Sequence, residues 1–281
     1  MYGNALAIAK IAEMASEIKV SEVFGRKATH LKDLVLNRLW DKQAKFFKVR
    51  LENGVLSDAR ETIGFIPWYF NLPNSDHAEA WFQVLDPAGF KAPYGLTTAE
   101  RRHPQFRSHG VGTCEWDGAV WPFASTQILV GMANFLRYDR LPGFTSKDYF
   151  EAMLTYARAH HKKGKPYIGE YLDEKTGDWL NGDNQRSRYY NQSAFGDLVI
   201  SGLVGLIPRE DNAIEIHPLI PPSTWKWFGL DHLNYHGKTL TIFWDETGGK
   251  YNRGKGLFVY VGGKMIAHSP ILKKIHGTIP D

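Results

Sequence analysis

Carboxylates and large aromatic rings occur together in two short segments of the sequence. Residues 115–122 read EWDGAVWP, and residues 169–179 read GEYLDEKTGDW, with YNQS following at 190–193. A carboxylic acid can protonate a leaving oxygen, a carboxylate can activate water, and flat rings can stack on the face of a sugar. This combination is typical of glycoside hydrolysis.

The candidate catalytic residues are Glu170 and Asp117. Glu170 lies beside a large ring, in a loop that leads to an apolar stretch, although exposed loop acids are usually only solvated. Asp117 lies just before Pro122, a residue well placed inside a helix start, so a role as helix cap is the alternative for Asp117. The candidate substrate-binding residues are Arg60, Trp68, Tyr69, Glu115, Trp116, Trp121, Tyr171, Asn191 and Gln192. Aromatic rings are also ordinary core material.

Composition excludes several other classes of function. The chain has 281 residues, with 34 basic and 30 acidic side chains and a net charge of +4, and it has no long basic run, so nucleic acid is not an expected partner. A single cysteine excludes an internal disulfide. The apolar stretches are too short to cross a bilayer and no signal peptide is recognisable, so we expect no membrane partner, and either a cytoplasmic location or a true start that is missing from this sequence. Because the common metal and nucleotide motifs are absent, neither a metal nor a cofactor is expected.

Up to about residue 208 the sequence predicts helices, and these helices must position the two segments. Apolar periodicity predicts helices over residues 4–19, 21–40, 62–70, 77–85, 120–138, 147–162 and 190–206. The first two form an antiparallel pair, and Ile8, Ile11 and Ile18 lie on one face of the first helix. Ser21 is the expected N-cap of the second helix. Residues 86–117 and 163–189 are predicted to be irregular.

After Pro208 the apolar pattern changes to period two. Residues 213–218, 238–244 and 257–261 alternate or form short apolar runs between turns, as expected for antiparallel strands. We therefore predict two domains, a partial helical barrel over 1–208 and a β unit over 209–281. The predicted fold class is mainly α, with the helical hairpins of a toroid followed by a small antiparallel β unit.

Several stretches taken together resemble one known family. They are ETIGFIPWYF at 61–70, YGLTT at 94–98, WDGAVWPFASTQ at 116–127, GEY at 169–171, TGDW at 176–179 and YNQS at 190–193. With these stretches the chain resembles the C-terminal half of an (α/α)6-barrel glycoside hydrolase. The nearest group is the mannosylglycerate hydrolase-like enzymes, which are related to glycoside hydrolase family 63 and more distantly to trehalases. The resemblance covers essentially the whole chain.

The resemblance implies an inverting hydrolysis of α-glycosides. It gives Glu170 the role of general base and makes Trp116 and Trp121 part of the lining of the sugar pocket. Relatives often carry Asn or Arg after the first tryptophan, where this chain has Asp117, so the role of Asp117 stays open. In the family the general acid is an aspartate from the first half of the barrel, which would lie ahead of Met1. An inverting pair of carboxyl groups is separated by about 6.5–9.5 Å.

Three functional hypotheses remain open. The first is an inverting glycosidase, or a fragment of one, that acts on a carbohydrate and receives its general acid from outside this chain. The second is an inactive carbohydrate-binding remnant. The third is a structural domain that self-associates, because a half toroid leaves apolar helix faces bare. The expected partners are a carbohydrate together with either a second copy of the chain or the missing N-terminal half.

Overall fold

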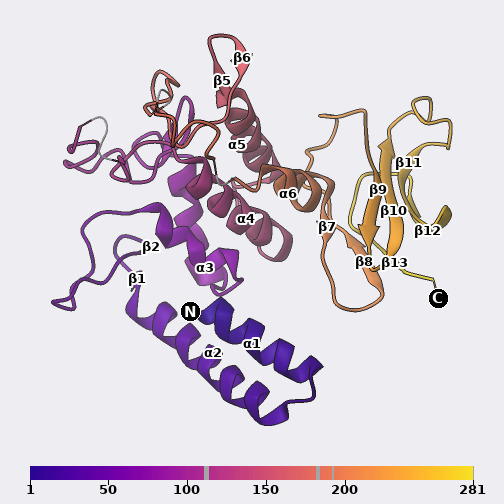
Figure 1. Ribbon diagram of the computed structural model, residues 1–281, viewed down its shortest axis with the longest axis horizontal. Coiled ribbons are helices and arrows are strands. Elements are labelled where there is room, and N and C mark those ends of the chain that lie inside the picture. Colours follow the sequence, from indigo (N-terminus) through magenta and orange to yellow (C-terminus); the bar gives the residue numbers. More distant parts are fainter. Residues whose placement is uncertain (111–113, 182–183, 192, 281) are drawn as a thin grey trace. The chain divides into compact units, whose positions relative to one another are not determined.

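The computed structural model describes residues 1–110, 114–181, 184–191 and 193–280 (Figure 1). By its internal contacts the chain divides into two compact units. The first unit comprises Met1–Phe144 and Thr155–Gln192, and the second comprises Thr145–Leu154 and Ser193–Asp281. Helix α5 (Ser146–Ala159) contributes residues to both. None of the helices within the described ranges has the length and apolar character that a membrane crossing requires.

The first unit is mainly helical. Its helices are α1 (Tyr2–Met14), α2 (Ile18–Arg38), the 3-10 helix η1 (Thr62–Phe65), α3 (Ile66–Tyr69), the 3-10 helix η2 (Ser75–Val84) and α4 (Pro122–Tyr138). Short antiparallel ladders join β1 (Trp40–Asp41) to β2 (Phe46–Phe47), β3 (Lys91–Ala92) to β4 (Gly95–Leu96), and β5 (His161–Lys162) to β6 (Lys165–Pro166). The helices predicted at 62–70, 77–85, 120–138 and 147–162 are confirmed with shifted ends.

Helices α1 and α2 lie side by side as an antiparallel pair (Figure 1). Ala5, Ala9 and Ala12 are buried along α1 at helical spacing, and Ala28 is the buried residue of α2. Small side chains allow two helix backbones to approach closely, so the pair packs along its alanine face.

Several large apolar side chains of this helix pair are exposed to solvent. Ile8, Ile11 and Ile18 are 39%, 65% and 57% exposed. The helical period is confirmed, but the packed face is the one that carries the smallest residues. Ser21 is not an N-cap, because α2 begins at Ile18 with Glu17 as its N-cap residue.

An aromatic cluster forms the core of the first unit. The ring centroid of Phe65 lies 4.9 Å from that of Phe46 and 4.9 Å from that of Trp81, and all three side chains are fully buried. Gly64 permits this packing, because a Cβ at that position would lie 2.2 Å from the backbone oxygen of Phe47.

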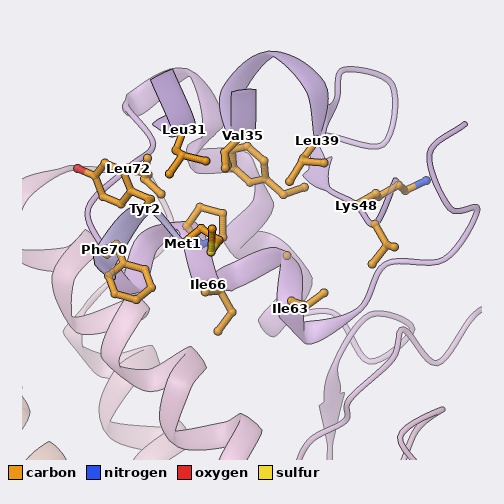
Figure 2. Close-up of a pocket in the computed structure, with 15 residues that line it drawn as sticks. Met1, Tyr2, Leu31, Val35, Leu39, Lys48, Ile63, Ile66, Phe70 and Leu72 are labelled. Carbon is orange, nitrogen blue, oxygen red and sulfur yellow. The ribbon is translucent and has the colours of Figure 1, made fainter. Parts of the chain in front are cut away.

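An apolar cavity of about 250 Å³ lies beside this core (Figure 2). Leu31, Val35 and Leu39 of α2 line one side, and Ile63 and Ile66 line the other. No carboxylate is among the described residues that line the cavity. Acid–base chemistry of the kind predicted from the sequence therefore has to take place elsewhere.

Extended segments bring the two predicted acidic and aromatic stretches together. Isolated β-bridges pair Thr97 with Val120, Val120 with Leu172, and Leu172 with Trp179. Val120 and Leu172 exchange two backbone hydrogen bonds of 3.0 Å each, and both side chains are buried. Helix α4 begins at Pro122, directly after this pairing. The segment before α4 and the segment around residue 171 are thereby held against each other.

The second unit consists mainly of antiparallel strands. Its helical segments are α6 (Phe195–Asp197) and the π-helix η3 (Leu198–Val204). One sheet has the order β12 (Lys264–Ser269), β11 (Gly256–Val261), β10 (Lys238–Asp245), β9 (Trp227–Tyr235), and another has the order β13 (Ile275–Thr278), β8 (Ala213–Ile216), β7 (Leu206–Ile207). The strands predicted at 213–218, 238–244 and 257–261 are confirmed as β8, β10 and β11.

The last predicted helix is shorter than expected. Helical structure begins only at Phe195, so Tyr190 and Asn191 lie outside it. Tyr189 has a positive φ of 64°, a left-handed conformation that no helix accommodates in its interior. Gly205, with a φ of 88°, is the left-handed residue that ends η3.

Candidate active site

Three aromatic rings form a stack at the start of α4. The centroids of Trp116 and Trp121 are 4.1 Å apart, and those of Trp121 and Tyr171 are 4.7 Å apart with planes inclined by only 12°. Because Val120 pairs with Leu172, the next residues of the two antiparallel segments, Trp121 and Tyr171, stand opposite each other. Trp121 and Tyr171 are buried, whereas Trp116 is 45% exposed. The outer ring of the stack is therefore open to solvent.

Glu170 lies next to this stack and is oriented by a buried serine. The Ser187 hydroxyl donates a hydrogen bond of 2.5 Å to Glu170 Oε2, and Asn181 Nδ2 donates one of 2.7 Å to Ser187 Oγ. Since Ser187 Oγ accepts from the asparagine, its own hydrogen is directed to the carboxylate. Glu170 itself is half-buried. The arrangement fixes one carboxylate oxygen and holds the side chain at the edge of the protein.

The Tyr171 hydroxyl remains protonated over the ordinary pH range. Burial raises the pKa of Tyr171, the nearby groups Glu115, Cys114 and Glu170 raise it further, and Arg107 opposes them. A neutral phenol beside Glu170 can donate a hydrogen bond.

The loop that carries Glu170 is anchored through Asn191. Asn191 Nδ2 donates to the backbone oxygen of Gly169 over 3.0 Å and contacts His160 Nε2 at 3.1 Å. The other ring nitrogen of His160 lies 2.7 Å from the carbonyl oxygen of Tyr156. A carbonyl can only accept, so His160 Nδ1 carries the proton and Nε2 accepts from Asn191. Burial lowers the pKa of His160, which favours this neutral ring.

Gly169 is required at its position by close packing. A Cβ there would lie 2.5 Å from the indole ring of Trp179. The backbone therefore packs closely against Trp179 immediately before Glu170, and the stacked Tyr171 follows Glu170 directly in the sequence.

Arg107 joins the two acidic segments through ion pairs. Its Nη2 lies 2.7 Å from Glu115 Oε2, and its Nη1 lies 2.8 Å from Glu174 Oε2 and 3.4 Å from Asp173 Oδ2. Glu115 and Glu174 are buried. Burying two carboxylates is costly unless a cation compensates them, and Arg107 supplies that charge from the long loop. Glu115, a predicted substrate-binding residue, is thus placed as a partner of Arg107.

Asp117 is paired with a histidine. Its Oδ2 lies 2.8 Å from His109 Nδ1 and accepts a hydrogen bond from the His109 backbone at 3.2 Å. Burial acts to raise the pKa of Asp117, but the hydrogen bonds from His109 outweigh it and the pKa is lowered overall. The alternative role as a helix cap is wrong, because α4 begins at Pro122 with Trp121 at the N-cap.

The other predicted substrate-binding residues have contacts away from the stack. Trp68 is buried in the aromatic core against Phe65 and Trp81, and Arg60 Nη1 donates to Glu100 over 2.7 Å. Tyr69 is partly exposed and packs against its neighbour in sequence. An aromatic ring such as that of Trp68 suits a sugar pocket and a protein core equally, so its type alone does not tell the two roles apart. Gln192 lies outside the described residues.

Sequence reasoning did not select Ser187, Asn181 or His160 as parts of a site. Serine and asparagine are ordinary loop residues, and no spacing relative to Glu170 distinguishes them. Within the described residues, no group of three His, Cys, Asp or Glu side chains is arranged to hold a metal ion. Arg107 forms ion pairs with Glu115, Asp173 and Glu174.

Residues 1–193 match the family model of the mannosylglycerate hydrolase MGH1-like glycoside hydrolase domain, and residues 208–268 match the C-terminal domain of glycosyl hydrolase family 65. The fold and the acidic, aromatic site thus occur in a glycoside hydrolase domain. More particularly, the chain belongs to the MGH1-like family.

Two solved structures show how this chain relates to longer proteins. It is similar to a structure named "Sialidase", with 49% identity and a TM-score of 0.95, over 98% of this chain and 26% of that chain. It also shares its fold with the family 63 mannosylglycerate hydrolase of Thermus thermophilus, solved with Tris and D-glycerate, with 20% identity and a TM-score of 0.52 over 70% of this chain and 44% of that chain. The chain therefore spans less than half the length of either.

Proposed function

We propose that this chain carries the general base and part of the sugar-binding surface of an inverting glycoside hydrolase that acts on α-glycosides, and that its helices belong to an (α/α)6 toroid. The observation that carries this proposal is Glu170, fixed by the Asn181–Ser187 hydrogen bonds beside a ring stack whose outer member, Trp116, is exposed. A held carboxylate next to an exposed aromatic face suits a sugar ring and a water molecule together.

In this proposal Glu170 removes a proton from water while the water attacks the anomeric carbon. The hydrogen bond from Ser187 occupies Oε2, which leaves the carboxylate directed rather than free to rotate. Trp116 stacks on the apolar face of the sugar. A general base of this type contributes about 10²–10⁴-fold to the rate.

We propose that the general acid comes from outside this chain. Asp117 is the alternative within it, but its lowered pKa keeps it ionised near neutrality, and its carboxylate is engaged by His109. An acid catalyst must hold a proton when the leaving oxygen departs, so Asp117 is poorly suited to that task.

Substrates that do not need an acid can test the base separately. The fluoride of an α-glycosyl fluoride leaves without protonation, so the chain should hydrolyse α-mannosyl or α-glucosyl fluoride and should not hydrolyse ordinary α-glycosides. NMR should show the β-anomer as the first sugar product. Glu170→Gln should lower kcat by at least about 100-fold. Glu151→Gln, which removes an exposed carboxylate on α5, is the control and should leave kcat unchanged.

The same ring stack also favours a second candidate function, carbohydrate binding without turnover. Saturable binding of a saccharide with no fluoride release from either substrate would support that function and contradict the catalytic one. Fluoride release that Glu170→Gln does not affect would show that another group is the base.

A further inference from the structure

A second concave surface with both aromatic and polar lining lies in the second unit. A groove of about 350 Å³ opens over strands β9, β10 and β11, and Phe243, Tyr251 and Tyr260 supply its rings. Pockets that hold small ligands have volumes of about 300–1,000 Å³ and a mainly apolar lining with a few polar groups. The groove has these properties, and none of its residues belongs to the ring stack or the Glu170 loop.

The register of the sheet places the rings of this groove on one face. Tyr260 of β11 pairs with Thr241 of β10, and Phe243 follows Thr241 by two residues, so the three side chains share a face. The Phe243 and Tyr260 rings are nearly parallel, with planes inclined by 13° and centroids 5.8 Å apart. Tyr251 adds a third ring, 5.0 Å from Phe243.

A glycine keeps this part of the sheet open. Gly229 of β9 pairs with Phe243, and it lines the groove without a side chain. A Cβ at Gly229 would lie 2.9 Å from the Tyr251 hydroxyl oxygen. The tyrosine hydroxyl thus approaches the strand where a larger residue would fill the space.

Polar groups of opposite charge border the rings. Asp231 Oδ1 accepts hydrogen bonds from Thr241 Oγ1 at 2.5 Å and from the His232 backbone at 2.9 Å, which fix the carboxylate. The hydrogen bond from Thr241 has the largest effect, and together these bonds lower the pKa of Asp231 and keep it ionised. Asp231 Oδ2 also lies 3.0 Å from His232 Nδ1. Arg253 lines the groove too, so the two charged side chains among the described lining residues have opposite signs, and the groove suits a ligand without net charge.

We propose that this groove is a second saccharide-binding site, which takes a neutral hexose unit of an oligosaccharide. A hexose has an apolar C–H face that stacks on aromatic rings and hydroxyl edges that can donate to Asp231 and accept from Arg253. The choice of a saccharide among neutral polar ligands rests on the proposed function. The description of the groove does not depend on that proposal.

An NMR titration of the ¹⁵N-labelled full chain tests the site. Mannotriose and maltotriose are the probes, and the amides of Gly229 and Gly263 report on the groove. We expect at least one probe to shift both amides saturably. Tyr260→Ala should weaken this binding by about tenfold, while Tyr260→Phe, which keeps the ring, and Tyr138→Ala, an exposed tyrosine of the first unit, should not. Asp231→Ala should weaken it as well, and provides a second test if Tyr260→Ala fails to fold.

Two results would overturn the proposal. One is the absence of any shift at Gly229 and Gly263 with either probe at millimolar concentration. The other is unchanged affinity in a folded Tyr260→Ala or Asp231→Ala variant. Glu170→Gln separates this site from the proposed active site, because it should abolish fluoride release and leave the groove shifts as they are in the unmodified chain.

Discussion

Ser187 should contribute to the orientation of Glu170 rather than to substrate binding. Ser187→Ala removes the hydrogen bond to Glu170 Oε2 and leaves Asn181 Nδ2 without its acceptor. We expect kcat on the α-glycosyl fluoride to fall by about tenfold with little change in KM, and the free energy of unfolding to fall by about 1 kcal/mol. Steady-state kinetics and urea denaturation check this. Ser108→Ala, at an exposed loop serine, is the control; an unchanged kcat in Ser187→Ala would contradict the assignment.

The loop anchored by His160 should weaken as the pH falls. Burial lowers the pKa of His160 in the folded protein, so the unfolded chain binds the proton more readily. The contribution of the neutral ring is therefore fully present above the unfolded pKa of about 6.5 and is lost as the pH falls from there through the folded pKa, by up to about 1.4 kcal/mol per pH unit. A protonated Nε2 also cannot accept from Asn191.

Denaturation between pH 5 and about 8 measures this effect, in the range where histidine titrates. His160→Gln should flatten the pH dependence, because an amide oxygen can accept from Asn191 without titrating. His30→Gln changes an exposed histidine of α2 and should leave the dependence in place. Equal slopes for His160→Gln and the unmodified chain would contradict the assignment.

The sequence indicated rings that the structure brings together, but not the polar residues that contact Glu170. Trp116, Trp121 and Tyr171 do come together as a stack, because the pairing of Val120 with Leu172 sets Trp121 opposite Tyr171 and Trp116 lies on Trp121. Trp68 is also a large ring near a helix start, but it belongs to the core. Ser187 escapes prediction because its hydrogen bond to Glu170 depends on how a loop folds back, which no local spacing encodes.

At the scale of secondary-structure elements, periodicity predicts where helices lie better than which face they bury. The first helix pair packs along alanines while its isoleucines face outward, because helix approach depends on the smallest side chains in a stripe. The sequence shows β10 as an alternating pattern and β11 as a short apolar run. Strand β9 does not, because most of its residues are polar or exposed.

Two glycines in helical segments should respond oppositely to the same substitution. Gly64→Ala would place a Cβ 2.2 Å from the backbone oxygen of Phe47, so the core must shift and we expect a loss of about 1–3 kcal/mol in the free energy of unfolding. Gly25→Ala, in α2, meets nothing within 4 Å and should add about 0.5–1 kcal/mol through helix propensity. Urea denaturation of both variants checks this; a Gly64→Ala variant as stable as the unmodified chain would contradict the packing.

At the scale of the whole molecule, we propose that a second copy covers the apolar surface of α1 and α2. The outward side chains that are more than half exposed on the two helices are Ile11, Met14, Ile18 and Val23. Exposed apolar side chains favour association, since each 100 Å² removed from water contributes about 2.5 kcal/mol. We expect light scattering at micromolar concentration to report a mass above that of one chain.

The double variant Ile11→Glu, Ile18→Glu should restore the mass of a single chain, because a charge on each helix opposes apolar contact. Thr29→Glu adds a charge at an exposed position of α2 outside this surface and should leave the association unchanged. A monomer already in the unmodified chain would argue instead that another segment, such as the preceding half of a longer enzyme, covers these helices.

The stacked indoles of Trp116 and Trp121 give the protein an optical property as well as a packed surface. Two identical chromophores 4.1 Å apart and inclined by 20° share their excitation, so their transitions split instead of absorbing independently. The size and sign of that splitting depend on the mutual angle of the rings. A sugar that tilts the exposed ring of Trp116 would therefore change the circular dichroism of the pair, and the chain carries its own spectroscopic reporter, without a label, at the place where we propose that sugar binds.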